Sequence, residues 1–64
     1  MRTDRDLIDR FIALCAERGE TQTQMARMVR RSRGWASLLV NGRIKRLHFA
    51  TRNRIAKVLE KENA

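Results

Sequence analysis

Residues 21–42 read TQTQMARMVRRSRGWASLLVNG, and this stretch decides the fold because it contains two short helical segments separated by a polar break. Thr21 and Gln24 stand three residues apart, which is the spacing of a capping box at a helix N-terminus. We therefore predict a helix that begins after Thr21 and ends by Arg31. Its expected apolar residues are Met25, Ala26, Met28 and Val29.

A second helix is predicted over residues 33–40. Ser32 precedes it, and serine is a favourable N-cap because its hydroxyl accepts a hydrogen bond from a free backbone N–H. Asn41 and Gly42 follow it, and both residue types tolerate the left-handed conformation that ends helices. The expected inward residues of this helix are Ala36, Leu39 and Val40. Two short helices joined by a tight turn are typical of a helix-turn-helix.

Helical patterns also flank this stretch. Residues 4–18 follow Thr3, which has capping-box spacing to Asp6, and Gly19 is a natural stop. A further helix is expected over residues 49–60, and residues 61–64 are expected to fray. The expected core residues of these two helices are Leu7, Ile8, Phe11, Ile12, Cys15, Phe49, Asn53, Ile55, Ala56 and Leu59. With no strand pattern in the chain, the prediction is one compact all-α domain of four helices over residues 1–64.

Charge is divided unevenly along the chain. Residues 21–59 contain ten basic and no acidic residues, whereas residues 1–20 and 60–64 each have a net charge of −1. A block with one sign of charge repels itself in the folded state unless a polyanion binds it. Nucleic acid is the polyanion that this pattern favours.

Composition argues against several classes of protein. No segment has the roughly 18 consecutive apolar residues of a membrane span, and the N-terminus lacks the pattern of a signal peptide. Cys15 is the only cysteine, so we expect a buried, reduced thiol and a cytoplasmic location. His48 has no ligand-spaced companions, so no metal or cofactor is expected. We also expect no enzymatic activity, because no nucleophile–base pair or Gly-rich phosphate loop is present.

The segment Gln22–Ala26 resembles the first motif helix of the phage lambda repressor and Cro family, which favours Q-x-x-[LM]-A there. Ser32 and the pair Asn41-Gly42 stand where that family has a serine and Asn-Gly, and residues 55–59 resemble its later Ile-Ala-x-x-Leu helix. The resemblance covers about residues 21–59 and implies a lambda-repressor-like helix-turn-helix fold. Arg30 stands where the family has glycine, so a positive φ there would be strained. The family's fifth, dimerising helix has no counterpart.

A major-groove role follows for the helix over residues 33–40. Its outward residues are expected to contact bases: Arg33, Gly34, Ser37 and Leu38. Residues around it are expected to contact phosphates: Gln22, Arg31, Ser32, Asn41, Arg43, Lys45 and Arg46. The phosphate role of Gln22 is implied by the family resemblance. Trp35 is expected in the core, with stacking on DNA or on a partner subunit as the alternatives.

These patterns predict a sequence-specific transcriptional regulator, a repressor of phage, prophage or mobile-element type. Its expected partner is double-stranded DNA with a palindromic operator, bound by a homodimer because one short helix reads few bases. Neither a small-molecule ligand nor a membrane is expected as a partner. The alternatives are a protein-partner module such as an antitoxin component, a non-specific nucleic-acid-binding protein, and a helix that lies on a membrane surface.

Overall fold

The computed structural model of the chain describes residues 4–62, and within this range it contains four α-helices and no strand. They are α1 (Asp4–Glu17), α2 (Gln22–Met28), α3 (Arg33–Val40) and α4 (Phe49–Glu62). The all-α four-helix prediction is confirmed, and α3 has the predicted bounds. Helix α4 runs to Glu62, so the fraying expected from residue 61 is wrong for residues 61 and 62. The expected cap Thr3 and residues 63–64 lie outside the described residues.

Local capping determines where α2 and α3 begin. The backbone N–H of Gln24 donates to Thr21 Oγ1 at 3.2 Å, and the Thr21 N–H donates to Gln24 Oε1 at 2.8 Å. This is the predicted capping box, which satisfies two backbone donors reciprocally. The Trp35 N–H donates to Ser32 Oγ at 3.3 Å, so Ser32 is the N-cap of α3.

The first three helices end in the same way. Gly19, Arg30 and Gly42 have φ angles of 68°, 56° and 73°, respectively. After α2, the Arg31 N–H donates to Ala26 O at 2.8 Å and the Arg30 N–H donates to Arg27 O at 3.2 Å. These two bonds form a Schellman motif, in which the left-handed residue is usually glycine. Arg30 therefore adopts the positive φ that is strained for a residue other than glycine.

Helix α3 ends at Asn41 and Gly42, as predicted. Asn41 has a φ of −82°, and only Gly42 adopts the left-handed conformation. Gly42 closes a Schellman motif, because the Arg43 N–H donates to Leu38 O and the Gly42 N–H donates to Leu39 O. One left-handed residue is enough to make both bonds.

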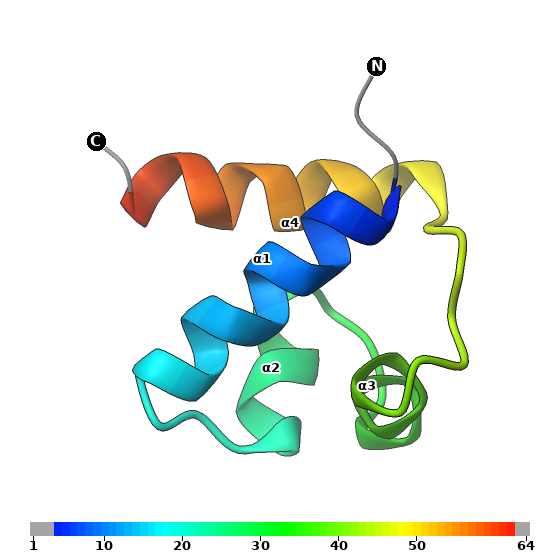
Figure 1. The fold of residues 1–64 in the computed structure, drawn as a ribbon, viewed down its shortest axis with the longest axis horizontal. Helices are drawn as coiled ribbons and strands as arrows, with labels where there is room; N and C mark the ends of the chain where they lie inside the picture. The colour runs from blue at the N-terminus through cyan, green and yellow to red at the C-terminus, as the bar shows by residue number, and fades with distance from the viewer. Residues whose placement is uncertain (1–3, 63–64) are drawn as a thin grey trace.

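Helix α1 packs on α4, and α2 packs on α3; α1 runs obliquely from its start beside α4 toward the loop that leads into α2 (Figure 1). All four helices contribute to the core, and its most deeply buried large side chains are Phe11, Leu39, Ile55, Val29 and Cys15. Trp35 is buried too, which confirms the core assignment for this residue. The expected core residues Leu7, Ile12, Met28 and Leu59 are partly buried against this cluster.

Three expected core positions are wrong. Val40 is 42% exposed and Phe49 is 71% exposed, while Asn53 is also on the surface. Helix α4 buries the expected Ile55 together with Thr51, which lies one turn before it and was not expected in the core. Val40 is the last residue of α3, and the packing of α3 on α2 is completed by Trp35, Ala36 and Leu39.

The connection between α3 and α4 also contributes to the core. This segment, residues 43–48, is called the basic connection because it contains Arg43, Lys45 and Arg46. Its Leu47 is buried and its Ile44 is half-buried. No helix between residues 4 and 62 is long and apolar enough to cross a membrane.

Candidate nucleic-acid interface

The outward face of α3 has the residues that sequence analysis assigned to it. Arg33, Gly34 and Leu38 are exposed, and Ser37 is half-buried. Asn41 is exposed just after the helix, and its Nδ2 donates to Ser37 Oγ at 3.5 Å. Because Trp35, Ala36 and Leu39 hold the opposite face in the core, this outward face is fixed in orientation and open to a ligand.

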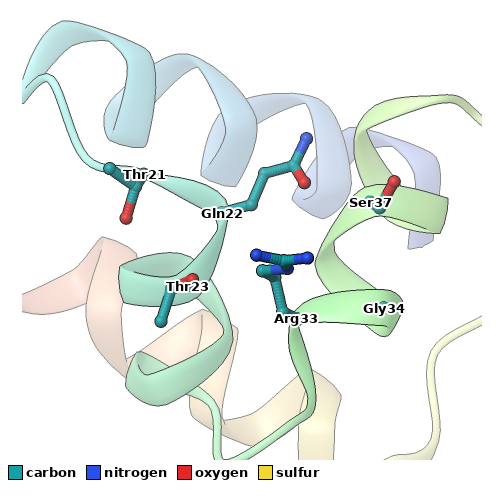
Figure 2. A pocket seen from close by; sticks show the side chains of 6 residues that line it. All are labelled: Thr21, Gln22, Thr23, Arg33, Gly34 and Ser37. Carbon is teal, nitrogen blue, oxygen red and sulfur yellow. The ribbon is translucent and has the colours of Figure 1, made fainter.

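An open hollow lies between the start of α2 and the outward face of α3. It is lined by Thr21, Gln22, Thr23, Arg33, Gly34 and Ser37. In Figure 2 the side chains of Gln22 and Arg33 extend into the space between the two helices, and Ser37 stands across it on α3. The structure therefore brings the predicted phosphate residue Gln22 beside three of the four predicted base-contacting residues.

Two residues of this hollow were missed by sequence reasoning. Thr21 and Thr23 are both exposed beside Gln22. Thr21 was assigned only as a cap, a role it does have, and Thr23 received no role. The available signal was their position, because residues adjacent to Gln22 at the start of a helix lie on the same edge of the molecule.

The basic connection has its cations on the outside. Arg43, Lys45 and Arg46 are exposed, whereas Ile44 and Leu47 turn inward. None of the three cations lines the hollow between α2 and α3. Lys45 instead borders a second hollow, whose lining also includes Arg5, Asp9, Val40 and Ile44. The predicted phosphate residues thus lie in three groups: Gln22 at the start of α2, Arg31 and Ser32 just before α3, and the residues after α3.

Arg31 lies over the aromatic ring of Trp35. Its guanidinium carbon is 5.8 Å from the ring centroid, which is within the range of a cation–π interaction. Trp35 is buried and Arg31 is exposed, so the guanidinium lies on the solvent side of the indole. The charge of Arg31 therefore stays at the surface, next in the chain to Ser32 and Arg33.

The ion pairs of residues 4–62 leave the central cations unpaired. The pairs are Arg5–Asp9, Arg10–Asp6, Arg18–Glu20, Arg18–Glu62 and Arg52–Asp4. No cation between residues 27 and 46 takes part in a pair within the described chain. These cations are Arg27, Arg30, Arg31, Arg33, Arg43, Lys45 and Arg46, and all are exposed. The surface of α2, α3 and the basic connection is therefore strongly positive without internal compensation.

Residues 4–62 contain neither a metal-ligand cluster nor an exposed thiol. No cluster of three or more His, Cys, Asp or Glu side chains within residues 4–62 is arranged to hold a metal ion. Cys15 is 1% exposed, and burial raises the pKa of its thiol to about 11, with the nearby Glu20 carboxylate acting in the same direction. Such a thiol stays protonated at neutral pH and is a poor nucleophile.

Comparisons with models of known protein families, with characterised proteins and with solved structures found no match to this chain. The assignment of the interface therefore depends on the chain's own residues: an outward α3 face, the hollow beside it and a surrounding set of unpaired cations.

Proposed function

We propose that this protein is a sequence-specific DNA-binding transcriptional regulator that inserts α3 into the major groove. The observation that carries the proposal is the set of exposed, unpaired cations between residues 27 and 46, which flank the open outward face of α3. Such cations bind phosphates and supply affinity, while an exposed helix face reads base edges. The resemblance of residues 21–59 to the lambda repressor and Cro family supports the same function.

In this proposal, each exposed residue of α3 makes a different contact with the bases. Arg33 stands in the first turn, where its forked guanidinium can pair with the O6 and N7 of one guanine. Ser37 follows one turn later on the same face, and Leu38 offers an apolar contact for a thymine methyl group. Gly34 lacks a side chain and lets the helix backbone approach the base edges closely.

The surrounding residues hold the DNA backbone. Gln22 on α2 faces the same hollow as Arg33, so it meets the phosphates beside the bases that Arg33 reads. Arg31, Ser32, Asn41, Arg43, Lys45 and Arg46 contact phosphates on either side of α3. These contacts orient the protein without reading sequence.

Repression is the simplest regulatory mechanism for a domain of this size, because occupancy of an operator needs no activation surface. We propose a cytoplasmic regulator of phage, prophage or mobile-element type that binds as a homodimer. Its half-sites would lie about 10 bp apart or a multiple of that distance.

Selection of bound duplexes from a random pool tests this proposal. A palindromic consensus is expected, with at least about 10³-fold preference over random DNA at moderate salt. Equal affinity for all duplexes would identify a non-specific nucleic-acid-binding protein instead. Retention of a stoichiometric protein partner without any enriched duplex would favour a protein-interaction module.

Two substitutions separate base reading from phosphate binding on the selected site. Arg33→Ala should remove about 1–3 kcal/mol of discrimination at one base position. Lys45→Ala should weaken binding to all duplexes equally and reduce the salt slope by about one. Lys57→Ala on α4 is the matched control, because it removes the same charge from an exposed site outside the proposed interface. Equal loss on specific and random DNA for Arg33→Ala would exclude Arg33 as a reading residue.

A further inference from the structure

Asp4 makes two contacts that reach outside its own helix. The backbone N–H of Leu47 donates to Asp4 Oδ2 at 2.9 Å, and Arg52 Nε lies 3.1 Å from Asp4 Oδ1. The Asp4 side chain is only 16% exposed. One carboxylate therefore joins the start of α1 to the end of the basic connection and to the first turns of α4. As one of the acids at the start of α1, Asp4 is suited to the helix dipole, but that effect does not require these two contacts.

The basic connection has few other polar restraints. Among residues 4–62, its other hydrogen bonds to the helices are those of Gly42 and Arg43 at the end of α3, and those that the Arg52 and Ala50 N–H groups donate to His48 O and His48 Nδ1. Between these ends, the Leu47 N–H bond to Asp4 is the only hydrogen bond that ties the segment to α1. The remaining restraint is apolar, from the buried Leu47 side chain and the half-buried Ile44. The placement of the segment therefore depends heavily on Asp4.

The connection alternates outward cations with inward apolar residues, so its placement determines where the cations meet DNA. Arg43, Lys45 and Arg46 point outward because Ile44 and Leu47 point inward. A restraint on the Leu47 backbone thus sets the direction in which Lys45 and Arg46, the two preceding residues, are presented. Ordering these cations before binding avoids an entropy cost at the moment of contact with phosphates.

We propose that Asp4 is a positioning residue for DNA binding, which holds the connection 43–48 so that its cations meet the same duplex as α3. The inference rests on the proposed function. It assigns to an acidic side chain a favourable effect on the binding of a polyanion. Simple electrostatics demands the opposite sign, because removing a negative charge from a protein strengthens its attraction to DNA.

The experiment tests whether removing the Asp4 charge weakens or strengthens DNA binding. Affinity for the selected duplex is measured for the full chain, for Asp4→Ala, for Asp4→Asn and for Asp9→Ala. Asp9 is the matched control, because it lies on the same helix, carries the same charge and has only a loose, exposed pair with Arg5 at 3.9 Å. Asp9→Ala should bind DNA as tightly as the native chain or more tightly. Asp4→Ala should bind about tenfold more weakly, since a charge-assisted hydrogen bond and an ion pair are lost together.

Asp4→Asn should fall between these two, because the amide oxygen of asparagine can still accept the Leu47 N–H bond. In the background of Lys45→Ala with Arg46→Ala, the effect of Asp4→Ala should largely disappear, because the cations that Asp4 positions are already absent. A general loss of folding would instead reduce affinity equally in both backgrounds.

Amide hydrogen exchange without DNA provides a second measurement. In Asp4→Ala the Leu47 amide should exchange at least about tenfold faster, while amides in the middle of α3 keep their native rates. If exchange at Leu47 is unchanged, or if Asp4→Ala binds DNA as tightly as Asp9→Ala, the inference is overturned. Failure of the native chain to bind any duplex would refute the proposed function, and the exchange experiment would still decide whether Asp4 holds the connection.

Discussion

Replacing Arg30 with glycine should stabilise the protein. Arg30 occupies the left-handed position of a Schellman motif with a φ of 56°, where the equivalent residues after α1 and α3 are Gly19 and Gly42. A left-handed residue with a Cβ atom costs about 1–2 kcal/mol. The Arg30 side chain is exposed and makes no ion pair within residues 4–62, so the substitution removes no native contact of that kind.

The net gain in stability from Arg30→Gly is smaller than the backbone strain that the substitution removes. Glycine makes the unfolded chain more flexible, which offsets about 0.4–1 kcal/mol. The difference leaves Arg30→Gly more stable by roughly 0.5–1 kcal/mol, which corresponds to an increase in Tm of about 2–8 °C for a domain of this size. Thermal and urea unfolding followed by circular dichroism at 222 nm, the usual helix wavelength, measure both quantities.

Gly42→Ala is the matched control, because it introduces the reverse change at the same position of a second Schellman motif. A Cβ atom at Gly42 has no neighbour within 4 Å, so its effect comes from the backbone alone. The free energy of unfolding of Gly42→Ala should be lower by roughly 0.5–1 kcal/mol, because the added left-handed strain is only partly offset by the reduced flexibility of the unfolded chain. Gly42→Ala is expected to lower Tm. If Arg30→Gly lowers Tm as well, an interaction of the Arg30 side chain outweighs its backbone strain, and the reasoning is refuted.

Two further predictions use sites with contrasting surroundings. Gly34→Ala should raise stability by about 0.5–1 kcal/mol, because the added Cβ atom makes only an ordinary contact with Ser32 Oγ at 3.8 Å, while DNA affinity falls. An increase in both Tm and DNA affinity would remove Gly34 from the interface. The Cys15 thiol should resist alkylation at neutral pH unless the protein unfolds. Because burial raises its pKa from 9.0 to about 11, the folded state holds this proton more tightly than the unfolded state, and stability should fall as pH rises from 9 to 11. Cys15→Ala should lack this component of the pH dependence, and an identical slope in both proteins would contradict the assignment.

Helix ends were predictable from sequence because their causes are local. The capping box at Thr21, the N-cap Ser32 and the left-handed Gly42 each act within a few residues of themselves. The outward face of α3 followed from the same information, since capping and helical periodicity together place Arg33, Ser37 and Leu38 opposite Ala36 and Leu39.

Other features of the site were decided by packing between distant segments. Phe49 and Asn53 were expected inside, but α4 meets α1 along the stripe that contains Thr51 and Ile55. Apolar residue type alone does not distinguish these faces, because α4 has apolar residues on more than one side. Val40 was also expected inside, but it lines an open hollow with Ile8 and Ile12 of α1 and is 42% exposed.

The sequence by itself determined four helical segments, the caps of the two central helices and a middle block whose only ionic side chains are cations. Only the tertiary structure decided which face of α4 is buried, that Gln22 lies beside Arg33, and that Asp4 reaches Leu47 across 43 residues of chain. Capping bonds span three to five residues and are specified by neighbours, whereas these contacts depend on the relative positions of helices that pack around a shared core.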